Sequence, residues 1–148
     1  MAVLGSGDPA LAAAFSALAK EFPERVNLHS KFDEPFAHKL YASSDIFLIP
    51  SRFEPCGLGQ MIAMRYGAVP VASRTGGLAD TVFEDGPGAN GFLCEPGDAG
   101  SLGLALDRAL TEFGSPKWKK RVAAGMAGDF SWVRSMTSYS DLYARARA

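Results

Sequence analysis

The residues best suited to chemistry lie in the segment from Pro50 to Gln60, which reads PSRFEPCGLGQ. Its carboxylate, Glu54, can accept hydrogen bonds from the hydroxyl groups of a sugar. Gly57 and Gly59 allow a ligand to approach the backbone closely, because glycine has no side chain. The alternative is an ordinary turn between a strand and a helix, with Glu54 near the helix start, and the residues alone favour neither interpretation.

A second segment, RTGGL at residues 74–78, contains two adjacent glycines after a predicted strand. Gly76 and Gly77 would expose consecutive backbone N–H groups, which can bind an anion or a hydroxyl group. A flexible turn is the more common role of such a pair. Phe32, in a polar loop, can stack on a base, although a loop aromatic more often packs at an edge.

The elements that must position these segments alternate along the chain. Short apolar runs predict strands at residues 2–4, 26–30, 46–49 and 69–72, and helical periodicity predicts helices between them. This alternation is typical of a parallel sheet with right-handed crossovers, so we predict a doubly wound α/β domain. Ligands of such sheets bind at the carboxyl ends of the strands, where both segments lie.

The rest of the chain continues with a short strand at residues 91–93 and three helices. Ser131 is predicted to cap the last helix. The inner face of that helix is predicted to consist of Met136, Tyr139, Leu142 and Tyr143. Pro70 predicts a free edge or a bulge in its strand, because proline cannot donate to a sheet. No long linker interrupts the chain, so residues 1–148 are predicted to form a single domain.

Composition limits the classes of function. The chain has 148 residues, of which 47% are hydrophobic and 21% charged, with a net charge of −1. This balance excludes a polybasic nucleic-acid arm, and no apolar run reaches membrane-spanning length. The two cysteines and two histidines do not have the spacing of a zinc site. We therefore expect no metal, no nucleic-acid partner and no membrane partner.

Several longer motifs resemble the C-terminal half of bacterial glycogen synthases and of plant or algal starch synthases, which form glycosyltransferase family 5. They are SRFEPCGL at residues 51–58, MRYG at 64–67, VPV at 69–71 and TGGLADTV at 75–82. LGSGD at residues 4–8 and DFSW at residues 129–132 extend the similarity over the whole chain in the same order. Chance is a poor explanation for motifs of this length.

The resemblance implies a Rossmann-like, donor-binding C-terminal domain of a GT-B glycosyltransferase. Such an enzyme transfers glucose, with retention of configuration, from ADP-glucose to the non-reducing end of an α-1,4-glucan, either starch or glycogen. The resemblance makes Glu54 the catalytic residue, near the 3-hydroxyl of the donor sugar, and Phe32 the residue that stacks on adenine. The other residues implied to line the donor site are Cys56, Gly57, Leu58, Thr75, Gly76 and Gly77. The family needs no metal or other cofactor.

The chain departs from the family pattern in several places. Gly59 stands where a threonine is usual, and Ser73 where many relatives have a basic residue. Ile62 replaces a second glutamate found in other GT-B enzymes, as it does in starch synthases. Compared with the family pattern, we expect this chain to lack the N-terminal acceptor domain and the first strand–helix unit, which carries an Arg and a Lys for the diphosphate. Because half of a cleft cannot hold donor and acceptor in register, we expect a fragment that is inactive alone and binds ADP-glucose weakly.

Two other classes of function stay open. The chain can be a non-catalytic module that binds a sugar nucleotide or a glucan, or a scaffold domain without a ligand. The missing N-terminal domain of the same enzyme is the partner expected under the leading hypothesis. The expected compartment is the plastid stroma for a plant or algal source and the cytoplasm for a bacterial source.

Overall fold

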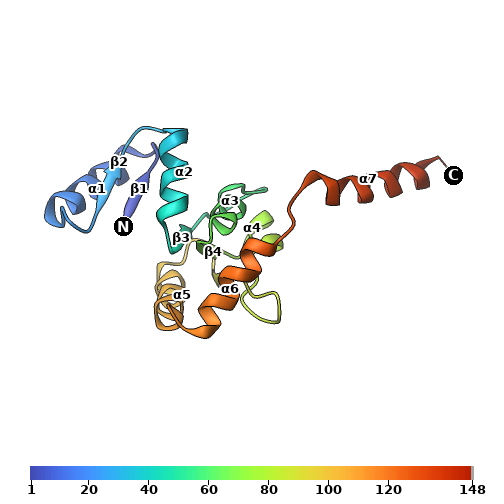
Figure 1. Cartoon of the computed structure of the whole chain (residues 1–148). Helices are drawn as coiled ribbons and strands as arrows, with labels where there is room; N and C mark the ends of the chain where they lie inside the picture. Colours follow the sequence, from blue (N-terminus) through green and yellow to red (C-terminus); the bar gives the residue numbers. More distant parts are fainter. Residues whose placement is uncertain (148) are drawn as a thin grey trace. The chain divides into compact units, whose positions relative to one another are not determined.

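The computed structural model describes residues 1–147. They divide into two compact units, Met1–Ser44 and Asp45–Ala148, whose elements are labelled in Figure 1. Every strand pair in both units is parallel, and helices alternate with the strands. The predicted α/β class with parallel sheets is therefore confirmed.

The first unit consists of β1 (Ala2–Leu4), α1 (Pro9–Glu21), β2 (Asn27–His29) and α2 (Glu34–Ser43). The two strands pair in parallel with Val3 opposite Leu28. The carboxylate of Asp8 accepts hydrogen bonds from the N–H groups of Ala10 and Leu11 and so caps α1. Asp33 caps α2 in the same way.

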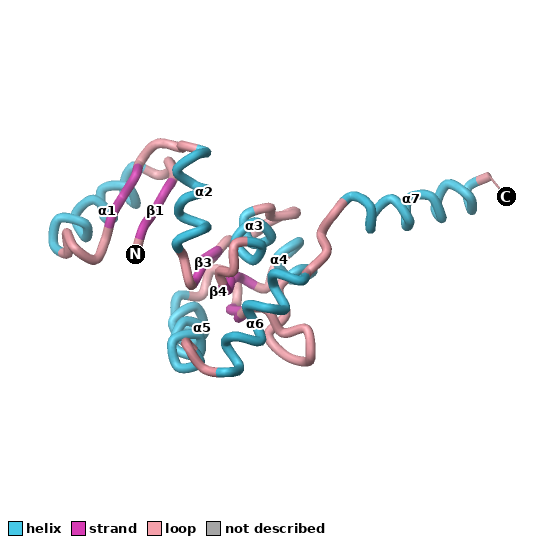
Figure 2. Tube along the Cα trace, viewed as in Figure 1, coloured by secondary structure: helices cyan, strands magenta, loops and turns pink. Residues whose placement is uncertain are grey.

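The second unit contains three strands and five helices. They are β3 (Ile46–Ile49), α3 (Gly59–Arg65), β4 (Val69–Ser73), α4 (Gly76–Thr81), β5 (Phe92–Cys94), α5 (Ala99–Glu112), α6 (Pro116–Ala127) and α7 (Trp132–Ala146). The strand order is β3-β4-β5, and the strands lie among the helices in Figure 2. The loops that follow β3 and β4 therefore begin at neighbouring strand ends.

The core of the second unit covers both faces of this sheet. On one face, Val69 and Val71 of β4 pack with Phe92 and with Trp118 of α6, and two alanines of α5 join them. On the other face, Ala72 and Leu93 pack with Leu78 and Val82. Every residue of β4 is buried, so the middle strand is a rigid base for the loop at its carboxyl end.

Pro70 does not mark a free edge or a bulge, because β4 is the middle strand of its sheet. The N–H of Val69 donates toward β3, and the N–H of Arg74 donates toward β5. Since donors alternate along a strand, the nitrogen of Pro70 faces the β5 side. Pairing with β5 begins only at Val71, so proline interrupts no ladder bond at this position.

The prediction of an inner face on the last helix is wrong for the described structure. All residues of α7 are exposed, and Met136, Tyr139, Leu142 and Tyr143 each expose between 51% and 65% of their surface. Ser131 occupies the cap position but makes no capping bond with its side chain. Its own N–H donates instead to the carboxylate of Asp129. The amphipathic pattern is present, but nothing in residues 1–147 covers it.

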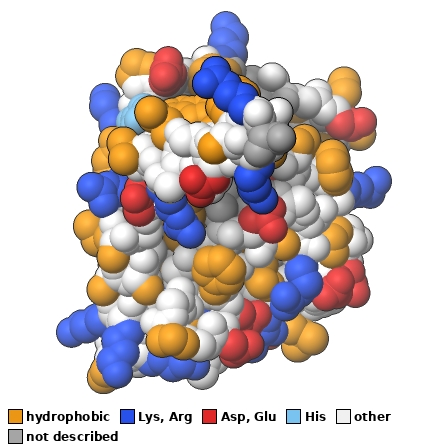
Figure 3. Space-filling view, turned by 90° about the vertical axis from the view of Figure 1, so that its right-hand side faces the viewer, with side chains coloured by type: hydrophobic (Ala, Val, Ile, Leu, Met, Phe, Trp, Pro, Cys, Tyr) orange, Lys and Arg blue, Asp and Glu red, His pale blue; other side chains and the backbone are white. Residues whose placement is uncertain are grey.

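Positive and negative side chains are interspersed on the face drawn in Figure 3. This mixture agrees with the net charge of −1. Within the described part of the chain, no helix combines the length and the apolar composition needed to cross a membrane.

Candidate functional site

The candidate site is the junction between two loops of the second unit. One loop joins β3 to α3 and contains Glu54 and Cys56, and the other joins β4 to α4 and leads into the glycine pair, Gly76 and Gly77, with which α4 begins. The N–H of Gly77 donates a hydrogen bond of 3.0 Å to the carbonyl oxygen of Glu54. The two predicted segments, which are separate in sequence, are therefore brought together.

This junction leaves no room for side chains. A Cβ atom built on Gly76 would lie 2.0 Å from the carbonyl oxygen of Glu54. A Cβ atom built on Gly77 would lie 1.9 Å from the carbonyl oxygen of Cys56. Both distances are far below van der Waals contact, so the paired glycines are a requirement of the loop contact and not a flexible turn.

Gly57 satisfies a different requirement in the first loop. Its φ angle of +72° lies in the left-handed region, which side chains rarely adopt. A Cβ atom there would also lie 2.5 Å from Oε1 of Gln60. The φ angle favours glycine at this turn from β3 into α3, and any other residue would also require the Gln60 amide to move.

The side chains around the junction remain available to a ligand. The Glu54 carboxylate is half-buried, and the Ser51 hydroxyl lies 3.5 Å from its Oε2, at the limit of hydrogen bonding. Cys56 and Leu58 are exposed. Thr75 occupies the cap position of α4 without using its hydroxyl as a cap. A carboxylate, a hydroxyl and tightly packed backbone together form a surface suited to a polyhydroxylated ligand.

The predicted site residues are distributed unevenly between the units. Glu54, Cys56, Gly57, Gly76 and Gly77 form the junction itself. Leu58 and Thr75 immediately flank it in sequence. Phe32 belongs to the first unit, in the loop between β2 and α2, and exposes 75% of its surface.

Sequence reasoning missed two residues, Gln60 and Thr81, which together link the first loop to the glycine pair. The side-chain amide nitrogen of Gln60 lies 2.7 Å from the carbonyl oxygen of Gly57 and 3.1 Å from the hydroxyl of Thr81. A polar residue on the buried side of α3 was the available signal for Gln60. For Thr81 the signal was its position four residues after Gly77, the spacing at which a threonine hydroxyl bonds a helical carbonyl.

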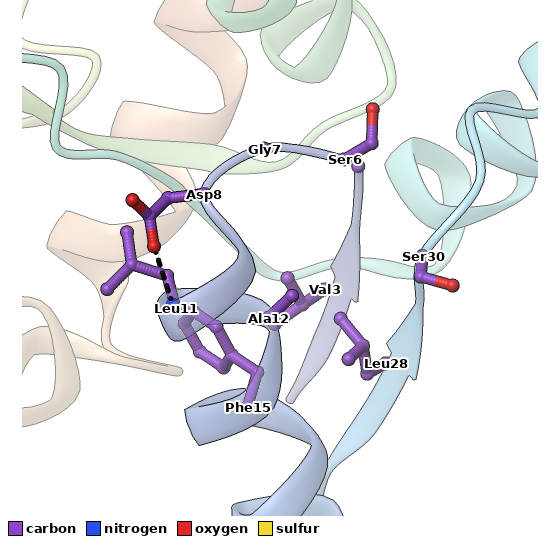
Figure 4. Close-up of a pocket in the computed structure, with 10 residues that line it drawn as sticks. Val3, Ser6, Gly7, Asp8, Leu11, Ala12, Phe15, Leu28 and Ser30 are labelled. Carbon is purple, nitrogen blue, oxygen red and sulfur yellow. Dashed lines mark hydrogen bonds between the residues drawn. The ribbon is translucent and has the colours of Figure 1, made fainter.

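A separate hollow of about 430 Å³ lies in the first unit. Figure 4 shows Val3, Leu28 and Phe15 lining it, while the Asp8 carboxylate is used to cap α1. The hollow is apolar apart from its serines and backbone, and the one carboxylate of its lining is occupied. It therefore lacks the free charged group that would orient a polar ligand.

Two glutamates outside the loops have lowered pKa values. Burial acts to raise the pKa of Glu84, but hydrogen bonds from Arg108 and from the N–H of Leu93 lower it overall. Burial likewise opposes the effect of Arg121 and Lys117 on Glu112, and the pKa of Glu112 is also lowered overall. Both carboxylates stabilise the second unit in their charged forms. Among residues 1–147, no three His, Cys, Asp or Glu side chains are grouped so that they could hold a metal ion.

Sequence comparisons find proteins that are similar to this chain over most of its length. The family model described as "Glycosyl transferases group 1" matches residues 1–112. The glycogen synthase of Thioalkalivibrio sulfidiphilus is 48% identical over 97% of this chain, and that of Syntrophotalea carbinolica is 46% identical over 99%. The chain spans 31% of the length of each of these relatives.

The chain is also similar to the solved structure of a starch synthase. The catalytic domain of Starch Synthase IV from Arabidopsis thaliana, bound to ADP and acarbose, superposes with a TM-score of 0.83 at 42% identity. The match covers 95% of this chain and 31% of that protein. Both units therefore match the Rossmann-like architecture of a GT-B glycosyltransferase.

Proposed function

Because the chain belongs to group 1 of the glycosyl transferases, we propose that it is the donor-binding part of a starch or glycogen synthase. The proposed reaction transfers glucose from ADP-glucose to the non-reducing end of an α-1,4-glucan, with retention of configuration. Support comes from the glycogen synthase relatives and from the starch synthase structure, which contains ADP and acarbose. The proposed partners are ADP-glucose, the glucan and the N-terminal domain of the same enzyme.

The observation that carries the proposal is the junction at Gly77 and Glu54. The N–H of Gly77 donates to the backbone carbonyl oxygen of Glu54, so the backbone that carries the Glu54 side chain is held beside the glycine pair. A donor sugar resting on this junction would meet the Glu54 carboxylate with its hydroxyl groups. Fixed placement of a carboxylate against the donor is the positioning that glycosyl transfer needs.

In the proposed reaction Glu54 is the catalytic residue. Cys56, Gly57 and Leu58 would lie along the donor sugar, with Thr75, Gly76 and Gly77 closing the pocket near it. Phe32 would stack on the adenine ring. ADP-glucose is the donor substrate, and we propose that no metal or other cofactor takes part, so that transfer persists in excess EDTA. The proposed compartment is the plastid stroma or the bacterial cytoplasm, according to the source.

The test is a chimera in which this chain replaces the matching segment of the Thioalkalivibrio sulfidiphilus glycogen synthase. We expect incorporation of radiolabelled glucose from ADP-glucose into glycogen, and loss of incorporation in the chimera carrying Glu54→Ala. A thermal melt identifies chimeras that have folded. A folded chimera that transfers no glucose, beside an active parent enzyme, would contradict the proposal.

A further inference from the structure

Gln60 has a buried amide side chain that lies between the first loop of the junction and helix α4. Only 1% of its surface is exposed. Its Nε2 donates to the carbonyl oxygens of Gly57 at 2.7 Å and Cys56 at 3.3 Å, both in the first loop. The same nitrogen donates to the hydroxyl of Thr81, in α4, at 3.1 Å. One side chain therefore links the loop after β3 to the helix after β4.

Thr81 continues this link to the second glycine loop. Its hydroxyl accepts from Gln60 and donates to the carbonyl oxygen of Gly77 at 2.6 Å. The N–H of Gly77 returns to the first loop by donating to the carbonyl oxygen of Glu54. The hydrogen bonds thus form a closed circuit, and a displacement of either loop must break at least one of them.

The remaining polar atom of Gln60 shows that packing alone does not explain this residue. Its Oε1 is buried and has no hydrogen-bond partner among the described residues. An unpaired buried acceptor destabilises a protein, and an apolar side chain would avoid this cost. Rotating the amide would place Oε1 against the carbonyl oxygens of Cys56 and Gly57, so the acceptors fix its orientation.

We propose that Gln60 and Thr81 are positioning residues, which set the distance between Glu54 and the glycine pair before the donor binds. This inference rests on the proposed function in taking the junction as the donor site. Neither side chain touches the donor. Both act through the backbone of Gly57, Cys56 and Gly77, because a loop already held in place loses little conformational freedom on binding.

Three substitutions in this chain separate positioning from general stability. Thr81→Val keeps the shape of the side chain and removes the hydroxyl, whereas Thr81→Ser keeps the hydroxyl. Gln60→Met removes both the donor and the unpaired Oε1. The matched control is Ser115→Ala, which removes a side-chain hydrogen bond to the N–H of Trp118 at the start of α6.

The readouts are amide hydrogen exchange of Gly77, ADP titration followed by amide chemical shifts, and a thermal melt. We expect Thr81→Val to accelerate exchange at Gly77 and to weaken ADP binding by about fivefold each, the effect of one lost hydrogen bond. Thr81→Ser should restore both quantities. Gln60→Met should weaken ADP binding while leaving the melting temperature near that of the unaltered chain. Ser115→Ala should lower the melting temperature alone.

The two proposals fail in different ways. If the unaltered chain shows no ADP-dependent shifts, the proposed function fails, while the exchange rate of Gly77 still tests the circuit. If Thr81→Val leaves both Gly77 exchange and ADP affinity unchanged, the positioning role is wrong. The same conclusion follows if Ser115→Ala weakens ADP binding as much as Thr81→Val does at an equal loss of melting temperature.

Discussion

Arg121 and Glu112 form a bidentate ion pair that is nearly buried in the second unit. Arg121 Nε lies 2.6 Å from Oε1 of Glu112, and Nη2 lies 3.3 Å from Oε2. The two side chains expose 4% and 11% of their surface. Nη1 of Arg121 also donates to the carbonyl oxygens of Glu84 and Gly91, so one guanidinium joins α5, α6 and the segment before β5.

Arg121→Met should therefore destabilise the chain strongly. The substitution leaves a nearly buried carboxylate with only the exposed Lys117 as a partner, and it leaves two carbonyl oxygens without their donor. Loss of one partner of such a pair lowers the free energy of unfolding by about 3–5 kcal/mol. Urea denaturation measures this value. Arg108→Met is the control, because 46% of the Arg108 side chain is exposed, and a loss of similar size there would contradict the argument.

The lowered pKa values of Glu84 and Glu112 predict a decline of stability in acid. A carboxylate whose pKa is lower in the folded state favours folding above its unfolded pKa, about 4.3 for glutamate. That contribution is lost as the pH falls through the lowered folded pKa. Melting temperatures recorded from about pH 6 downwards should be steady at first and then fall below about pH 4.

Glu112→Gln provides the control for this titration. Its melting temperature should be lower at neutral pH and should depend less on pH in the acid range, because one of the carboxylates with a lowered pKa is gone. A variant that keeps the full acid decline of the unaltered chain would show that Glu112 does not contribute to it.

Gly77→Ala tests the close contact between the two loops. The new Cβ atom would lie 1.9 Å from the carbonyl oxygen of Cys56, so the loops must separate. We expect a loss of about 2–4 kcal/mol in unfolding free energy, together with the loss of detectable ADP binding. Gly103→Ala in α5 is the matched control, since a Cβ atom there meets nothing within 4 Å. It should stabilise the chain by about 0.5–1 kcal/mol through helix propensity.

The sequence was sufficient for most of the fold because its signals were local. Asp8 and Asp33 are side chains that bond the next turn, so their roles as caps follow from neighbours in the chain. The apolar run at β3 needed only its own composition to be recognised as a strand, although the strand is only partly covered and Leu48 is exposed. These features depend on few residues far away.

The features that were missed depend on the positions of other strands and helices. Pro70 was interpreted as a sign of an edge, because nothing in its own segment reveals that β5 begins to pair one residue later. The sequence does not decide whether the glycine pair is a ligand site or a flexible turn, because the pair contacts the backbone of Glu54, which lies on another loop. Gln60 has a role only once Thr81 is beside it. Pairings across the sheet are invisible to periodicity.

Phe32→Ala tests the proposed stacking on adenine. The side chain is 75% exposed, so its removal should change the melting temperature little. If the ring stacks on the base, ADP affinity should fall by about 1 kcal/mol, or roughly fivefold, by analogy with base stacking on aromatic side chains. Phe32→Tyr keeps the ring and should bind ADP as the unaltered chain does. Equal ADP affinity for Phe32→Ala and the unaltered chain would show that Phe32 does not contribute to ADP binding.

The catalytic role proposed for Glu54 is tested by Glu54→Gln in the active chimera. The substitution keeps the size of the side chain and a hydrogen-bond acceptor, but it removes the negative charge. A charge near the anomeric carbon stabilises the positive character that develops there as the bond to ADP breaks. Its loss should therefore lower kcat much more than it raises KM, by about 100-fold or more if the charge acts mainly in the transition state.

The rival explanation is that Glu54 only fixes the turn from β3 into α3. Its carbonyl oxygen already does this by accepting from Gly77, and that bond is independent of the side chain. Under the rival explanation Glu54→Gln would leave kcat nearly unchanged, and Glu54→Ala would chiefly lower the melting temperature. Steady-state kinetics and thermal melts of both variants distinguish the two cases. A nearly normal kcat in a folded Glu54→Gln chimera would end the catalytic assignment, because the substitution leaves the backbone contacts of the junction in place.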